Sequence, residues 1–299
     1  MLTKKDIEMI LEKVKEHNLK FYNEKLNVEI KLLDLSDIKI EKNRNYGFID
    51  SSYINGIIGP YSYIYARAVI VSPKFLDEIA FFDIIADLFV SFENSEKEPV
   101  DINNISALIA KSLEYSLARK YSDLYIFMDG SIISDAILYS KFKDKLNYEN
   151  IESIRKKFIE DFSYMLNKKL ISIAKRILHS NMYGYTTSDM ILLLNKFPED
   201  EFYTEISEYL LSPQNKKIYI SYFRARKKDH IYRIEALDNI SKEEFKEIIF
   251  ETIYKNKSYP KYLKVAHNLC KVNNKEKLML ENILRSLLGY SFSVGWETK

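Results

Sequence analysis

The distribution of apolar residues predicts that the first half of the chain is rich in β-structure. Residues Tyr46–Tyr53 form an apolar-rich run that predicts a strand. The dipeptide Asn55-Gly56 is a turn signal, and the β-branched and aromatic residues of 57–72 predict a second strand that pairs with the first. The apolar run 75–92 fits a helix or a strand equally well. We therefore expect an early hairpin.

Helical and extended patterns alternate in the rest of the chain. Apolar periodicity predicts helices at 3–17, 102–118, 151–168, 242–255 and from 260 to the end, and strands at 123–128, 170–174, 218–223 and 230–236. Early strands followed by this alternation are typical of an α/β fold, with a mixed β-sheet flanked by helices. Because no Gly/Ser/Pro-rich linker divides the chain, we expect residues 1–299 to form a single domain with helical insertions, and helix 3–17 to be an extension.

Two aspartates stand at the ends of apolar runs and are followed by small residues. Asp50 follows Phe48-Ile49, and Asp129 follows Ile126-Phe127-Met128. A carboxylate at the exit of a buried strand is desolvated on one side and open on the other, which is a suitable place for a metal ligand. Asp-Ser-Ser and Asp-Gly-Ser are also ordinary turn sequences, so a turn remains the alternative at each position.

Glu114 lies on the predicted helix 102–118, and most of its neighbours at three and four residues are apolar. It could point across a small-residue face to join the two aspartates, or it could be a boundary glutamate paired with Lys111. Three converging carboxylates repel one another unless a cation neutralises them. Hard oxygen ligands favour Mg²⁺ or Mn²⁺, which can support phosphoryl displacement.

Charge and cysteine usage restrict the class of protein. The net charge is +2, so any nucleic-acid binding has to come from a local patch or from oligomerisation. Cys270 is the only cysteine, which excludes a disulfide framework and a cysteine zinc site within one chain. The N-terminus becomes charged at once, and no apolar run approaches the roughly 20 residues needed to span a bilayer. We expect a soluble, cytoplasmic protein.

The C-terminal part adds a tyrosine and a histidine. Tyr259-Pro260 marks a helix start, and His267 follows two turns later between Lys264 and Lys271. A histidine in a lysine stripe is a candidate metal ligand or phosphate contact, although a lone boundary histidine is more often structural. The pair Lys175-Arg176, after strand 170–174, could bind phosphate or be solvated. For Arg233 and Glu235 we favour a surface ion pair.

Taken in order, these segments resemble the NurA family of archaeal and bacterial nucleases that process DNA ends. The likeness covers roughly 46–288. The segments that match the family pattern are Asp50-Ser51-Ser52, Glu114, Asp129-Gly130-Ser131, Ala174-Lys175-Arg176, Arg233-Ile234-Glu235 and, most specifically, Tyr259-Pro260-x-x-Leu263-x-x-Ala266-His267. Phosphate-binding loops, dinucleotide fingerprints, His-Glu-x-x-His and nucleophile elbows are absent from the sequence.

The resemblance implies an RNase H-like fold, Mn²⁺-dependent cleavage of DNA and a homodimer. It also implies a partnership with the hexameric HerA translocase in resecting DNA ends for homologous recombination and repair. By position, the metal ligands would be Asp50, Glu114, Asp129 and His267, and Tyr259 would help to position phosphate or water. Basic residues at or near the matched segments would contact DNA, namely Lys175, Arg176, Arg233, Lys264 and Lys271.

One departure from the family pattern leaves alternatives open. Ser51 stands where the pattern has glycine, which permits positive φ and close approach of the backbone to phosphate. The chain could therefore be a divergent paralogue that binds DNA or the translocase and cuts weakly or not at all. A different RNase H-like enzyme, acting on RNA or on DNA junctions, is a further interpretation.

Overall fold

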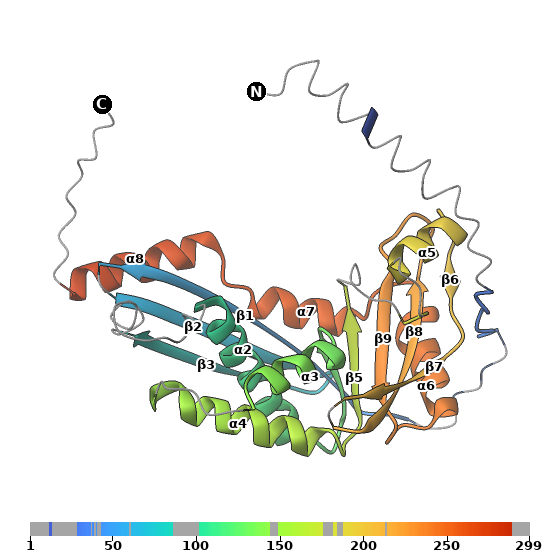
Figure 1. Ribbon diagram of the computed structural model, residues 1–299, viewed down its shortest axis with the longest axis horizontal. Coiled ribbons are helices and arrows are strands. Elements are labelled where there is room, and N and C mark those ends of the chain that lie inside the picture. The colour runs from blue at the N-terminus through green and yellow to red at the C-terminus, as the bar shows by residue number, and fades with distance from the viewer. Residues whose placement is uncertain are drawn as a thin grey trace.

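A continuous mixed sheet runs through the molecule (Figure 1). In this computed structural model the described residues are 12–13, 29–36, 38, 40, 43–59, 61–85, 102–143, 149–175, 182–183, 188–212 and 214–288. The strands are β1 (Tyr46–Ile58), β2 (Tyr61–Val71), β3 (Leu76–Ile85), β4 (Tyr125–Asp129), β5 (Leu170–Ala174), β6 (Phe202–Tyr203), β7 (Ser207–Leu211), β8 (Lys216–Arg224) and β9 (Tyr232–Leu237). Their order is β3-β2-β1-β4-β5-β9-β8-β6, with β7 also paired to β8.

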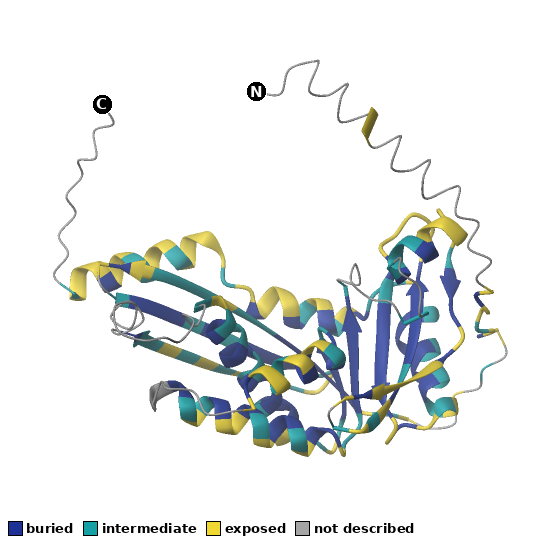
Figure 2. Cartoon of the chain, viewed as in Figure 1, coloured by how far each residue is buried: buried dark blue, intermediate teal, exposed yellow. Residues whose placement is uncertain are grey.

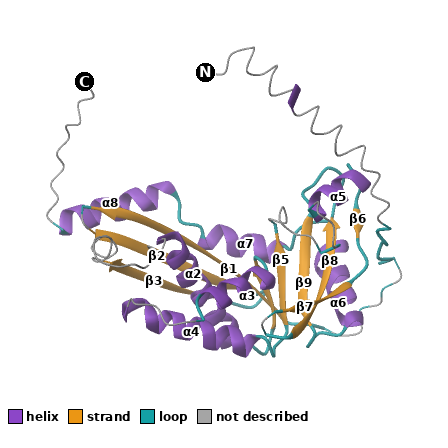
Figure 3. Ribbon diagram, in the orientation of Figure 1, coloured by secondary structure: helices purple, strands orange, loops and turns teal. Residues whose placement is uncertain are grey.

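The centre of the sheet is parallel and its flanks are antiparallel. Strands β1, β4 and β5 run parallel, whereas β2 and β3 on one side and β9 and β8 on the other run antiparallel to their neighbours. This arrangement confirms the predicted α/β class, with a mixed sheet flanked by helices. Figure 3 shows strands β1–β3 reaching away to the left of the shorter strands β5, β9 and β8.

Helices cover both faces of the sheet. They are α2 (Ile102–Lys120), α3 (Ile132–Lys141), α4 (Glu149–Met165), α5 (Asp189–Lys196), α6 (Lys242–Ile249), a π-helical turn η2 (Phe250–Tyr254), α7 (Lys261–Cys270) and α8 (Asn274–Leu287). Among these described helices, none combines the length and apolar character that crossing a membrane requires. The predicted N-terminal helix 3–17 lies outside the described residues, apart from 12–13.

Alternate side chains of the central strands build two separate cores. On β4, Ile126 and Met128 pack in the core that includes α2 and α4, whereas Tyr125 and Phe127 pack in the core that includes α6 and α7. Figure 2 shows β5 and its neighbour β9 as almost entirely buried. A strand that is covered on both faces consists of a continuous run of apolar residues. For that reason β4 and β5 could be predicted from the sequence.

The predicted turn at Asn55-Gly56 is wrong. Strand β1 passes through both residues and continues to Ile58, where it pairs with Tyr61 of β2. The side chain of Asn55 bonds to Ser106 of α2 at 2.9 Å. The ring of Tyr63 lies against Gly56, its partner on β2, so this glycine makes room for a ring instead of forming a turn.

Several other elements differ from the sequence-based expectation. The ambiguous run 75–92 contains the strand β3, and the predicted helix from 260 onwards is two helices. They separate before Asn273, whose side chain forms a capping box with Glu276 at the start of α8. Helices α3 and α5 and the short strands β6 and β7 were not predicted, and both helices have serine at the N-cap, Ser131 and Ser188.

Substituting Gly56 by alanine should destabilise the fold. The new Cβ would lie 2.6 Å from a ring carbon of Tyr63, and that ring cannot easily move because it is buried and its hydroxyl donates to Glu281 at 2.7 Å. Overpacking of this kind costs about 1–3 kcal/mol. Urea unfolding of Gly56→Ala beside Ile57→Ala, whose side chain is 54% exposed, measures the loss, and equal stability of the two variants would contradict it.

Candidate metal centre

Asp50 and Asp129 lie side by side because of the register of β1 and β4. The parallel ladder pairs Phe48 with Phe127 and Ile49 with Met128, and the next residue on each strand is an aspartate. Asp129 ends β4 as expected, whereas β1 continues beyond Asp50 and only its pairing with β4 stops there. Side chains two residues apart on a strand point to the same face of the sheet, so both carboxylates lie on the face of Phe48 and Phe127, which is covered by α7.

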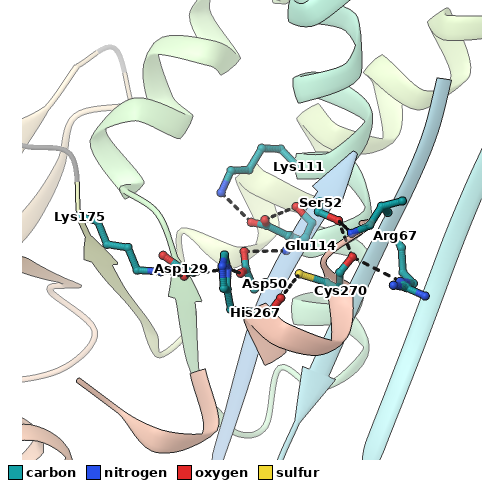
Figure 4. Close-up of polar contacts among 11 residues, drawn as sticks. Asp50, Ser52, Arg67, Lys111, Glu114, Asp129, Lys175, His267 and Cys270 are labelled. Atoms are coloured by element: carbon teal, nitrogen blue, oxygen red, sulfur yellow. Dashed lines mark hydrogen bonds and ion pairs between the residues drawn. The ribbon is translucent and has the colours of Figure 1, made fainter. Parts of the chain in front are cut away.

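Helix α7 brings His267 to the two aspartates. Pro260 precedes its first turn, and Leu263, Ala266 and Cys270 are buried against the sheet. His267 lies one residue after Ala266, at the margin of this buried face, and is half exposed. Its Nδ1 lies 2.6 Å from Oδ2 of Asp50 and 3.8 Å from Oδ2 of Asp129 (Figure 4).

The C-terminal end of α7 is fastened by polar side chains of β1 and β2. The Ser52 hydroxyl donates a hydrogen bond to the carbonyl of Cys270. Oγ of Ser52 also accepts a hydrogen bond from the backbone N–H of Val272 at 3.1 Å. Arg67 donates to the carbonyls of Cys270 and Lys271 at 3.4 and 3.2 Å. These bonds satisfy main-chain carbonyls that a helix end leaves unpaired. They therefore fix the position of His267 relative to β1 (Figure 4).

Glu114 reaches β1 from α2, which packs in the other core. Its Oε1 accepts a 2.5 Å hydrogen bond from the Ser51 hydroxyl, and its Oε2 lies 2.7 Å from Nζ of Lys111. The structure thus contains the predicted pairing with Lys111, but in a buried position, since Glu114 is 2% exposed. Burial raises the pKa of Glu114 to about 8, because Lys111 only partly offsets the desolvation.

Ser51 links Glu114 to Asp50. Its backbone N–H donates to Oδ1 of Asp50 at 2.8 Å while its hydroxyl bonds to Glu114. Ser51 lies within β1, opposite Ala68, and it is not among the described residues with positive φ. The serine that replaces the glycine of the family pattern is therefore not strained in this backbone.

Lys175 and Tyr259 border the exposed side of Asp129. Nζ of Lys175 contacts Oδ2 of Asp129 and lies 4.9 Å from the centroid of the Tyr259 ring. The Tyr259 hydroxyl is buried and makes no hydrogen bond to the described residues. Burial, followed by the charges of Asp129 and Asp50, raises the pKa of this phenol well above its usual range.

Arg233 and Glu235 form a buried pair, which corrects the expectation of a surface ion pair. Arg233 is 6% exposed and Glu235 is fully buried, and their side chains are 2.7 Å apart. Glu235 also accepts hydrogen bonds from Ser131 at 2.8 Å and Ser172 at 3.1 Å, and from the backbone of Ile133 at 3.3 Å. The pair therefore supports the loop after Asp129 from beneath, and its burial does not fit direct contact of Arg233 with DNA.

The remaining predicted basic residues are dispersed. Lys264 and Lys271 are exposed, one before and one after His267 on the same segment. Arg176 lies outside the described residues. Asp135, which was not predicted as a site residue, lies 3.5 Å from Lys111 and accepts a hydrogen bond from the hydroxyl of Tyr115 at 2.9 Å. Its position in the first turn of a helix capped by Ser131 was the available signal.

Asp50, Asp129 and His267 can hold a divalent cation. Among the described residues they are the only group of three potential ligands, with ligand atoms all within 4.8 Å of one another. Burial, followed by the charge of the neighbouring Asp129, raises the pKa of Asp50, and the contact with His267 opposes this rise. Two carboxylates with one imidazole suit Mn²⁺.

Substitution of Glu235 by alanine should strongly destabilise the protein. Arg233 would lose the buried carboxylate that lies 2.7 Å from it, and the two serines would lose their acceptor. Removing one partner of a buried pair costs about 3–5 kcal/mol. Chemical denaturation of Glu235→Ala, with Glu235→Gln as a partial rescue that keeps an acceptor oxygen, measures this cost. A loss below about 1 kcal/mol for Glu235→Ala would contradict the assignment.

The chain resembles one protein family in both sequence and fold. The NurA domain model matches residues 44–272. The crystal structure of the NurA nuclease from Sulfolobus solfataricus superposes with a TM-score of 0.66 at 15% identity, over 98% of this chain and 100% of that one. A crystal structure of NurA bound to dAMP and manganese superposes with a TM-score of 0.64 at 14% identity, over 98% of each chain. No curated protein sequence matches the chain. The family model covers most of the sequence, so the chain belongs to the NurA family.

Proposed function

We propose that this protein is a metal-dependent nuclease that hydrolyses phosphodiester bonds of DNA, with Mn²⁺ as the metal. The observation that carries the proposal is the convergence of Asp50, Asp129 and His267 at the point where β1 and β4 stop pairing. The solved NurA nuclease and the NurA bound to dAMP and manganese, which share the fold, support this choice of substrate and metal. Processing of DNA ends in recombination repair, in the cytoplasm, is the setting we infer from the family.

Each residue of the centre has a proposed role. Asp50, Asp129 and His267 would hold the metal, and when bound the metal would polarise the phosphate and lower the pKa of a water molecule. Glu114, attached to Asp50 through Ser51, remains a proposed ligand or orienting acid. Lys175 and Tyr259 border the exposed side of Asp129, where they could bind and orient a phosphate. Lys264 and Lys271 are proposed DNA contacts on the exposed side of α7.

Replacing Asp129 by asparagine should abolish Mn²⁺-dependent cleavage. The variant keeps the size of the side chain but loses the negative charge beside Asp50 and Lys175. We expect a loss of more than about 100-fold in kcat/KM, since even outer partners of metal ligands contribute 10–100-fold. The assay is degradation of a labelled DNA by wild type, Asp129→Asn and the control Asp123→Asn, an exposed residue just before β4. Stabilisation by Mn²⁺ in thermal melts should be lost in parallel. Cleavage by Asp129→Asn at the wild-type rate would refute the proposal.

The divergent-paralogue alternative is less well supported. The proposed catalytic residues are all present, and Ser51 fits its extended backbone without strain. DNA binding without hydrolysis in Mn²⁺ would nevertheless favour a binding protein. Cleavage of single-stranded DNA, duplex DNA and an RNA–DNA hybrid, compared side by side, separates the proposed DNase from an enzyme that acts on RNA.

We also propose that the protein forms a homodimer and acts with a HerA-type hexameric translocase. Support for a dimer comes from α8, which exposes a stripe of apolar side chains at helical spacing: Met279 is 64% exposed, Ile283 45% and Leu287 77%. The remaining apolar residues of the C-terminus lie outside the described residues. Support for the translocase comes from family membership alone.

Charges in this stripe should dissociate the dimer. Met279→Glu/Ile283→Glu would place two carboxylates in the apolar contact, where burying an unpaired charge is costly. Light scattering coupled to size-exclusion chromatography should give a dimer mass for wild type and for Arg285→Glu, an exposed position outside the stripe, and a monomer mass for the double variant. A dimer mass for the double variant would rule out α8 as the interface.

A further inference from the structure

We propose that five basic residues beside the metal centre bind the sugar–phosphate chain of DNA as it leaves the scissile position. These residues, which we call the basic rim, are Arg226, Lys227, Lys228, Lys255 and Lys257, and all of them are exposed. The first three lie in the turn between β8 and β9, and the other two lie in the loop between η2 and α7. The inference rests on the proposed nuclease function, which it extends from the reaction centre to a DNA path.

The sheet topology places the β8–β9 turn at the catalytic edge. Strand β9 is antiparallel to β5 and pairs Arg233 with Ala174, the residue before Lys175. The turn that precedes β9 therefore lies beyond the same end of the sheet as Lys175 (Figure 1). A hydrogen bond confirms the proximity, because Nε2 of His230 donates to the carbonyl of Lys175 at 2.6 Å.

The second loop joins the first and leads into the metal centre. Arg226 donates from Nε to the carbonyl of Lys257 at 2.6 Å, which ties the two loops together. Two residues after Lys257, the ring of Tyr259 packs on Tyr232 with centroids 5.2 Å apart. The basic rim is thus continuous with Tyr259 and Lys175, which border Asp129.

The backbone conformation of two rim lysines is an independent observation that favours a role for their positive charges. Among the described residues other than glycine, only Asn215, Lys228 and Lys257 have positive φ, at 52°, 63° and 44°. Asparagine and glycine tolerate this conformation, whereas lysine in it is strained by roughly 1–2 kcal/mol. Two rim lysines therefore occupy positions that turn geometry alone would give to glycine or asparagine.

Acidic neighbours do not neutralise the basic rim. Lys228 lies 3.4 Å from Glu199, and Lys257 lies 3.1 Å from Glu201, but both lysines are more than half exposed. Exposed pairs contribute only about 0–1 kcal/mol, so a phosphate can replace the carboxylate. Lys227 and Lys255 have no ion-pair partner among the described residues. Asp229, the residue after Lys228, is a further exposed carboxylate in this turn, so the five rim cations exceed the carboxylates of Glu199, Glu201 and Asp229 by two, a local excess of positive charge on a chain whose net charge is +2.

The test measures DNA binding without hydrolysis. Fluorescence anisotropy of a labelled 20-nucleotide single strand, in EDTA and over a range of salt concentrations, gives the Kd and the slope of log K against log salt. Lys228→Gly/Lys257→Gly removes two charges and relieves the backbone strain, so it should fold at least as well as wild type. The matched control, Lys216→Gln/Lys217→Gln, removes two charges at the opposite end of β8.

We expect the glycine variant to bind more weakly and to lose about 1.4 from the salt slope, at about 0.7 for each lost phosphate contact. The control should keep the wild-type slope. The proposed role of the basic rim would be overturned if the glycine variant kept the wild-type slope and Kd. It would also be overturned if the control lost as much as the glycine variant, or if wild type did not bind DNA. Wild type that binds through the rim but does not cleave in Mn²⁺ would instead refute the nuclease function, so the two failures are distinguishable.

Discussion

The parallel pairing of β1 with β4 determines the chemistry of this protein. Because the ladder between β1 and β4 stops at Ile49 and Met128, the next residue on each strand is an aspartate whose backbone pairs only on its other side, Asp50 with β2 and Asp129 with β5. Two carboxylates held this close repel each other, and the folded chain tolerates them because His267 and Lys175 contact them. The stability of the apolar core on both faces holds this unfavourable arrangement in place.

A second polar layer lies beneath these side chains and is fully buried. Glu235 accepts hydrogen bonds from two serines and from the start of α3, and Arg233 compensates its charge. A buried hydrogen-bond network fixes the positions of its side chains when every donor and acceptor has a partner. The loop after Asp129 is therefore held in place by hydrogen bonds to a buried carboxylate.

The sequence predicted the central strands, the long helices and the residues that meet at the site, but it did not predict the contacts that these residues make with one another. Strands β4 and β5 were recognisable because both of their faces are buried. The turn predicted at Gly56 was wrong because the sequence does not distinguish a glycine that makes room for an aromatic ring from a glycine in a turn. Arg233 and Glu235 looked like a surface pair because burial of a charge depends on partners distant in the chain. Glu114 was predicted as a site residue, but Ser51 lies between it and Asp50. This separation arises because α2 packs in the core on the opposite face of the sheet from α7.

The attachment of α7 has a consequence for the order in which the protein is made. His267 follows Asp50 by 217 residues, and the bonds that hold its helix to Ser52 and Arg67 involve the main chain of residues 270–272. While a ribosome is still synthesising the chain, the two aspartates can already be paired but the histidine is missing. The reactive centre is therefore complete only after residues 270–272 have been added to the chain.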